Sequence, residues 1–170
     1  MKQIKILGNN LKLQKCLYPL VEIDTLTLSK RYACDKNNNQ IKNDQGVYIF
    51  VSNKTLPKFN KKYFNSEVTG VFFKENSPYI KEMEIPPFNS PPKKDCIFYV
   101  GSDTHIISRV KEHWNKDKLN GCTSLKLGFT TRKWIKSILR VYVIHTQDLT
   151  IDYKSLEIEI RNEYGTAFGK

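Results

Sequence analysis

Two segments of this sequence decide its fold: GVYIFVS at Gly46–Ser52 and CIFYVG at Cys96–Gly101. Both are short runs of β-branched and aromatic residues bounded by glycine, a pattern typical of strands. A third run of the same kind, RVYVIHT at Arg140–Thr146, lies nearer the C-terminus. Together the three runs predict a small mixed or antiparallel central sheet.

Helical patterns fill the intervals between and after these strands. In HIISRVKEHWNK (His105–Lys116) the apolar residues recur at helical spacing, which predicts an amphipathic helix. TTRKWIKSIL (Thr130–Leu139) predicts a second helix or a helix-to-strand passage. YKSLEIEIRNEY (Tyr153–Tyr164) predicts a last helix that Gly165 ends. This order of elements is typical of the α+β class, with helices flanking the sheet.

We expect a single domain over residues 1–170, a length that suits one hydrophobic core. Residues 46–52 and 96–170 carry the core elements. Residues 1–45 form an N-terminal extension, where IKILG and LVEIDTLTL indicate short strands. Residues 53–95 form a long insertion between the first two core strands. The insertion holds six of the seven prolines, which argue against central strands or long helices within it.

The charge of the chain favours a polyanionic partner. Its 28 Lys and Arg against 17 Asp and Glu give a net charge of +11. Nine of the basic residues and two of the acids fall within residues 104–145, as in a nucleic-acid-binding surface. No apolar run approaches the roughly 20 residues of a membrane span. The segment MKQIKILGNNLKLQK lacks the apolar stretch of a signal peptide, so we expect a cytoplasmic protein with no membrane partner.

Four residues on the first two strands and the first helix have the chemistry that phosphodiester hydrolysis needs. Arg109 offers a planar, permanently charged fork for a phosphate. His113 follows four residues later, on the same helix face. A tyrosine near a cation can take a proton from water, and either Tyr48 or Tyr99 is a candidate for that role.

The last helix offers a metal ligand. Glu157 supplies the hard carboxylate oxygen that Mg²⁺ prefers, with phosphate and water completing the coordination. Glu159 falls on another face, because two residues along a helix correspond to a rotation of about 200°. Leu156 and Ile160 flank Glu157, which favours Glu157 as the carboxylate at the edge of the core.

These features in this order resemble the signature of the GIY-YIG nuclease superfamily. GVY and YVG resemble its two tyrosine motifs, Arg109 follows Tyr99 by ten residues, and the helix carrying Glu157 comes last. The resemblance covers residues 46–52 and 96–170 and is closest to a small type II restriction endonuclease. It implies a GIY-YIG nuclease-like fold in which the first two strands pair although the insertion separates them.

The resemblance also implies an activity, that of a Mg²⁺-dependent DNA endonuclease, with Mn²⁺ as an expected substitute. Water attack would be assisted by a tyrosine, an arginine would stabilise the phosphate, and a glutamate would bind the metal. The implied catalytic residues are Tyr48, Tyr99, Arg109, His113 and Glu157, the last of which is also the metal ligand.

The implied partner is double-stranded DNA. The residues expected to contact it are Lys58, Lys61, Lys62, Lys111, Lys116, Lys118, Lys126, Arg132 and Lys133. The insertion is a candidate DNA-recognition or dimer element, because a C2 homodimer suits a palindromic target. A restriction enzyme would also need a cognate methyltransferase that acts on the same site.

Two positions depart from the family pattern. Ser102 stands where many members have Lys, a gap that Lys111 or a lysine of the insertion would have to fill, and Gly169 stands where many have Asn. These departures leave open two alternatives: a catalytically impaired nucleic-acid-binding protein of the same fold, and an RNA-directed or antiviral nuclease.

Overall fold

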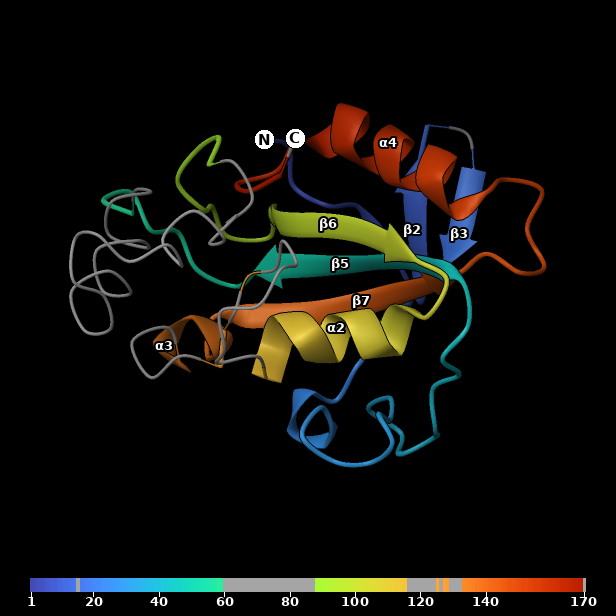
Figure 1. The fold of residues 1–170 in the computed structure, drawn as a ribbon. Coiled ribbons are helices and arrows are strands. Elements are labelled where there is room, and N and C mark those ends of the chain that lie inside the picture. Colours follow the sequence, from blue (N-terminus) through green and yellow to red (C-terminus); the bar gives the residue numbers. More distant parts are fainter. Residues whose placement is uncertain (15, 60–87, 116–124, 126, 129–132, 170) are drawn as a thin grey trace, which may run out of the picture.

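The computed structural model describes residues 1–14, 16–59, 88–115, 125, 127–128 and 133–169. Its centre is an antiparallel sheet with the strand order β4-β7-β5-β6 (Figure 1). The strands are β4 (Val21–Glu22), β5 (Gly46–Ser52), β6 (Ile97–Asp103) and β7 (Leu139–His145). The three predicted core strands are therefore confirmed, and the predicted α+β class is correct. Among these residues no helix has the length and apolar character needed to cross a bilayer.

The pairing of β5 with β6 brings the two tyrosine motifs together. Tyr48 lies opposite Gly101, and Phe50 lies opposite Tyr99. The expectation that these strands pair across the insertion is confirmed. The register then shifts so that Val51 faces Ile97, which leaves an extra residue in β6 as in a β-bulge. Tyr48 and Tyr99 thus lie on neighbouring strands, and β6 is the edge strand of the sheet.

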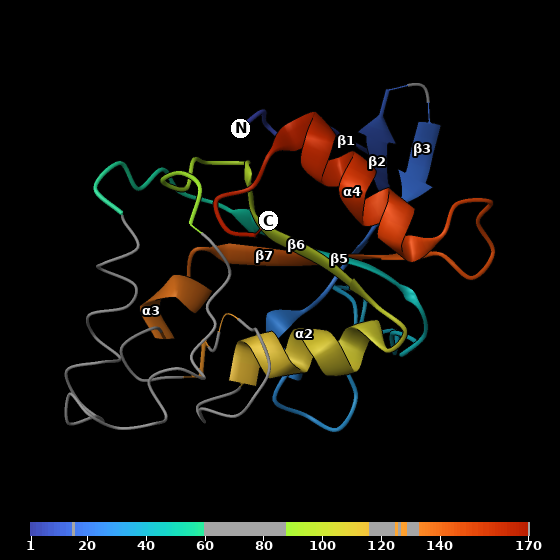
Figure 2. The same cartoon turned by 45° about the horizontal axis from the view of Figure 1, so that its top comes forward.

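One helix packs on each face of the sheet (Figures 1 and 2). Helix α2 (Ile106–Asn115) buries its apolar face against the core that contains Tyr48 and Phe50. Helix α4 (Tyr153–Tyr164) packs on the opposite face and ends at Gly165, whose φ of 68° suits glycine. Both helices match their predicted ranges closely. The predicted segment Thr130–Leu139 is helical only over the short α3 (Lys133–Lys136) within its described part.

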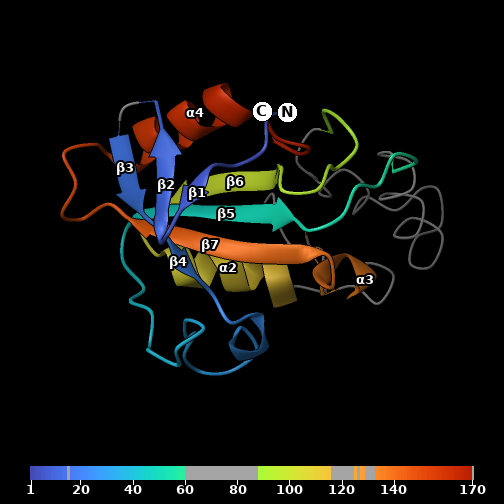
Figure 3. The same ribbon diagram turned by 180° about the vertical axis from the view of Figure 1, so that it is seen from behind.

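The N-terminal residues contribute to both sides of the molecule. Strands β1 (Ile6–Leu7), β2 (Asn10–Leu13) and β3 (Cys16–Pro19) form a separate small sheet that packs near α4 (Figure 3). Strand β4 instead joins the central sheet by pairing with β7. Part of the predicted N-terminal extension therefore belongs to the core sheet. The strand expected over LVEIDTLTL is short because Asp24 accepts a hydrogen bond from the Leu26 N–H and starts a 3-10 turn.

The two ends of the insertion lie side by side. The Leu56 N–H donates to the Pro92 carbonyl at 2.9 Å, and the Asp95 N–H donates to the Ser52 carbonyl at 2.7 Å. These bonds explain how β6 continues next to β5 after a long excursion of the chain. The proposed recognition or dimer role of the insertion falls mainly on residues 60–87, which lie outside the described residues.

The glycines of the two motifs are required by close packing. A Cβ added at Gly46 would lie 2.1 Å from the carbonyl oxygen of Ile144 on β7. A Cβ added at Gly101 would lie 2.3 Å from Oη of Tyr48. Gly46 therefore lets β7 approach β5, and Gly101 makes the space in which the Tyr48 phenol lies.

Replacing either glycine by alanine is expected to lower the free energy of unfolding by about 1–3 kcal/mol or more. Gly46→Ala should be the more harmful change, because strand pairing fixes the Ile144 carbonyl whereas the Tyr48 ring can rotate away. Urea denaturation followed by circular dichroism measures both effects. Values within about 0.5 kcal/mol of wild type, the range of neutral surface changes, would contradict this packing.

Candidate active site

The centre of the candidate site is a hydrogen bond between Tyr48 on β5 and His113 on α2. The phenol Oη and the imidazole Nε2 are 3.0 Å apart, and both side chains are buried. The backbone N–H of Leu125 donates to Nδ1 of His113 at 2.9 Å. Nδ1 must therefore be unprotonated, so the proton of the neutral ring lies on Nε2. It follows that His113 donates to Tyr48 and that the phenol proton is left to donate elsewhere.

Tyr99 on β6 lies beside the Tyr48 phenol. Its ring centroid lies 4.9 Å from that of His113 and 6.2 Å from that of Tyr48. Burial raises the pKa of Tyr99, whereas a hydrogen bond with Tyr48 lowers it. Burial raises the pKa of Tyr48 far above its usual value, and the charge and hydrogen bond of Tyr99 act in the same direction. Tyr99, which is half-buried at the edge strand, is thus the phenol closer to solvent.

Arg109 supplies the positive charge at this cluster. Its charge and a side-chain hydrogen bond lower the pKa of Tyr48, against the larger effect of burial, and its charge also lowers the pKa of Tyr99. The guanidinium forms an ion pair with Glu112 through Nη1. Arg109 precedes His113 by one helical turn, so the same face of α2 delivers both residues to the tyrosines. The sequence-predicted grouping of these four residues is therefore present.

Glu157 reaches the other side of Tyr99 from α4. Its charge raises the pKa of Tyr99, and the charge of Arg161 lowers it, so both groups lie near the phenol. One carboxylate oxygen, Oε1, pairs with Nη2 of Arg161. The other, Oε2, accepts a 2.5 Å hydrogen bond from Oγ of Ser102 on β6. The carboxylate is therefore held from both sides by this chain.

The donor chemistry at Glu157 fits Mg²⁺. Proteins commonly hold Mg²⁺ through one or two carboxylates, with substrate phosphates and water supplying the other oxygens. Glu157 offers the carboxylate, and the Ser102 hydroxyl is a second hard oxygen beside it. Among the described residues no group of three or more His, Cys, Asp or Glu side chains is arranged to hold a metal ion. These residues thus suit an ion that is bound jointly with a substrate.

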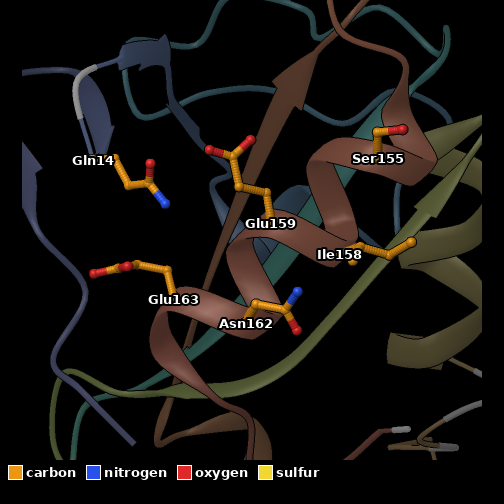
Figure 4. Close-up of a pocket in the computed structure, with 6 residues that line it drawn as sticks. All are labelled: Gln14, Ser155, Ile158, Glu159, Asn162 and Glu163. Atoms are coloured by element: carbon orange, nitrogen blue, oxygen red, sulfur yellow. The ribbon is translucent and has the colours of Figure 1, made fainter.

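The assignment of Glu157 rather than Glu159 to the site agrees with the geometry. Glu159 lines a separate groove of about 400 Å³ beside Gln14, on another face of α4 (Figure 4). The same groove is lined by Glu163, whereas Glu157 is absent from it. Glu159 therefore provides a matched position for comparison, on the same helix but away from the tyrosines.

Of the basic residues expected to contact DNA, the structure describes the side chains of Lys58 and Lys111 only, and their printed contacts lie away from this cluster. Nζ of Lys111 donates to the carbonyls of Lys30 and Arg31, at 2.8 and 2.9 Å, and so fastens that loop to α2. Lys58 is exposed beside an apolar hollow with Trp134. The positions outside the described residues are Lys61, Lys62, Lys116, Lys118, Lys126 and Arg132, and the side chain of Lys133 is likewise not described.

The two departures from the family pattern have structural reasons. Ser102 is the hydroxyl that fixes Glu157, and its short side chain fits beside the carboxylate. Gly169 has a φ of 121°, a conformation that glycine adopts readily and other residues rarely adopt. Nδ2 of Asn89 donates to the Gly169 carbonyl at 3.0 Å and holds this segment next to Tyr99.

Sequence reasoning missed Arg161 and the contact from Ser102. The spacing of Glu157 and Arg161, four residues apart on a predicted helix, is a readable signal for an ion pair. The Ser102 contact joins positions 55 residues apart on different elements, so no local pattern indicates it. Comparison with known proteins adds no candidate residue, because no protein-family model, curated protein or solved structure matches this chain.

The buried phenol of Tyr48 makes a pH-dependent contribution to stability. Its pKa is raised in the folded state, so the protonated phenol stabilises the fold fully below the unfolded pKa of about 10. That contribution is lost as the pH rises through the folded pKa. Tyr48→Phe has no such group and also lacks the hydrogen bond to His113.

We expect wild type to be more stable than Tyr48→Phe by about 1 kcal/mol at pH 8. The difference should shrink above pH 10, where only the wild-type unfolded chain gains from ionisation at this position. Urea denaturation of both proteins between pH 8 and pH 11 measures it. A difference that stays constant or grows over this range would contradict the raised pKa of Tyr48.

Proposed function

We propose that this protein is a Mg²⁺-dependent endonuclease of the GIY-YIG type that hydrolyses phosphodiester bonds in DNA. The observation that carries the proposal is the convergence of Tyr48, Tyr99, Arg109, His113 and Glu157 from two strands and two helices. Each residue type has a part in phosphoryl transfer, and the net charge of +11 favours a polyanionic substrate. The chain order and the pairing of β5 with β6 also agree with the sequence resemblance.

The hydrogen-bond direction suggests how the two tyrosines divide the work. Tyr48 is bonded to His113 and is only 2% exposed, which suits a positioning role. Tyr99 is half-buried, so it is the phenol available to orient a water. To take a proton from that water, Tyr99 must first lose its own proton to solvent and react as tyrosinate. The pKa of both phenols is raised although the charge of Arg109 lowers each, so ionisation of Tyr99 would need a further positive charge beside it.

Arg109 and Glu157 would act on the scissile phosphate from opposite sides of Tyr99. The guanidinium of Arg109 stabilises negative charge on the phosphate oxygens. Glu157 is the residue that would hold Mg²⁺, and the ion when bound supplies charge stabilisation for the leaving 3′ oxygen. His113 holds the Tyr48 phenol in place by donating to its oxygen.

The finer assignment is a sequence-specific type II restriction enzyme that acts in the cytoplasm. The core elements over residues 46–52 and 96–170 would carry the catalytic residues. The insertion and the N-terminal residues are therefore the candidates for recognising the target DNA sequence. Cleavage of both strands would need a homodimer or two successive events, because one such site cuts one strand. A cognate methyltransferase would then protect the host DNA.

A second candidate function is nucleic-acid binding without catalysis. The observation that favours it is the state of Glu157, whose two oxygens are engaged by Arg161 and Ser102. If that arrangement persists with substrate bound, the carboxylate has no free oxygen for a metal ion. Binding of DNA in Mg²⁺ without any product would support this candidate, and preferential cleavage of RNA would support an RNA-directed nuclease.

The test is incubation of the purified protein with unmethylated plasmid DNA in Mg²⁺ or in EDTA. We expect discrete fragments in Mg²⁺ only, and a loss of cleavage rate of about 10²-fold or more in Glu157→Gln. Glu159→Gln is the matched control, because it makes the same change on the same helix and should cleave like wild type. Equal rates for wild type and Glu157→Gln would contradict the proposal.

A further inference from the structure

We infer that Arg161 and a divalent cation compete for the carboxylate of Glu157, so that the free protein binds the cation weakly. The inference rests on the proposed function for the identity of the site and goes beyond it in naming Arg161. It starts from the ion pair between Nη2 of Arg161 and Oε1 of Glu157. The guanidinium thus lies against the oxygen that a metal ion would need.

The competition follows from charge and from the number of available oxygens. Oε2 of Glu157 already accepts a hydrogen bond of 2.5 Å from the Ser102 hydroxyl. Binding of a cation to the carboxylate therefore depends on Oε1. A divalent cation and a guanidinium repel each other, and at contact distance this repulsion is large in a partly buried site. The side chains of Glu157 and Arg161 are only 19% and 26% exposed, so solvent screens them less than a surface pair. Binding of the cation therefore requires Arg161 to move.

A phosphodiester provides the reason for Arg161 to move. The Nε–H of Arg161 is buried and has no hydrogen-bond partner in the described part of the chain, so the pair with Glu157 leaves a donor unsatisfied. A phosphate offers two oxygens to the guanidinium fork. Arg161 lies close enough to Tyr99 to lower its pKa, which puts it beside the proposed position of the substrate. Substrate and cation would then assist each other's binding, and this coupling is reciprocal.

A second ion pair of α4 is much more exposed to solvent than the Arg161–Glu157 pair. Lys2 pairs with Glu163 at 3.3 Å, and the lysine side chain is 69% exposed. Such a pair contributes little and is easily exchanged for water. The Arg161–Glu157 pair is instead enclosed by β6 and Tyr99, so its opening is a separate step that the affinity for the cation must reflect.

The experiment titrates Mn²⁺ into the protein without nucleic acid and follows free Mn²⁺ by electron paramagnetic resonance. We compare wild type with Arg161→Gln and with Arg161→Met, which keeps the apolar stem if the glutamine variant is unstable. Arg140→Gln is the matched control: Arg140 also pairs with a carboxylate, that of Asp95, and also has a buried Nε–H without a partner among the described residues.

We expect both Arg161 variants to bind Mn²⁺ about tenfold more tightly than wild type or more, the size of effect that groups next to a metal ligand produce. Arg140→Gln should bind like wild type. The gain should disappear in the double variant Glu157→Gln/Arg161→Gln. Unchanged affinity in both Arg161 variants would overturn the competition, and so would a gain that survives in the double variant.

The outcomes also separate this inference from the proposed function. DNA cleavage that needs Glu157, together with Arg161 variants of unchanged Mn²⁺ affinity, rejects the competition and keeps the nuclease. A gain in Mn²⁺ affinity that needs Glu157, in a protein that cuts no nucleic acid, upholds the competition and rejects the nuclease.

Discussion

The candidate site depends on one buried contact, the hydrogen bond from His113 to Tyr48 between α2 and β5. An unpaired phenol or imidazole in this core would be costly, so each needs the other. The Leu125 N–H donates to Nδ1 of His113. The proton of the neutral imidazole therefore lies on Nε2, and His113 donates to Tyr48. Because His113 donates to Tyr48, the phenol proton of Tyr48 is left for another acceptor, and Tyr99 is the neighbouring phenol. Gly101 leaves the space in which the Tyr48 phenol lies.

A second constraint lies at the edge of the central sheet, where α4 meets β6. Because β6 is an edge strand, Tyr99 and Ser102 can meet residues that arrive from α4. Glu157 is held there by a hydroxyl and a guanidinium, so its negative charge is balanced without an ion. If the protein is a nuclease, as we propose, the arrangement that binds the metal ion would be assembled only when a polyanionic substrate draws Arg161 away from Glu157. Part of the binding energy of the substrate would then be used to release Glu157 from Arg161, as in induced fit.

Local patterns in the sequence predicted much of this framework. The β-branched and aromatic runs at Gly46–Ser52 and Leu139–His145 are strands because both faces of the central sheet are covered by apolar layers. Helix α4 matches its predicted range because Gly165 ends it, and the structure adds that Asp152 caps its first turn. The grouping of the two tyrosines, Arg109, His113 and Glu157 came instead from the resemblance to the GIY-YIG nuclease signature.

What the sequence could not predict depends on contacts between distant residues. Strand β4 has only two residues, and it is a strand because β7 offers it an open edge. The ammonium group of Lys111, which we expect to contact DNA, also binds two carbonyls of the loop beside α2, and no local pattern indicates that contact. The engagement of Glu157 by Ser102 likewise joins β6 to α4. In each case the residue type was visible, but its partner was set by the tertiary fold.

The most direct test of the account is the tautomer of His113, measured by long-range ¹H–¹⁵N correlation spectra of the protein labelled with ¹⁵N-histidine. The account predicts a neutral ring at pH 7 with the proton on Nε2, because Nδ1 accepts the Leu125 N–H. The signals of His105 and His145 serve as references in the same spectrum. A proton on Nδ1 alone would reverse the donor direction between His113 and Tyr48, and protons on both nitrogens would rule out the hydrogen bond from Leu125; either result would contradict the account.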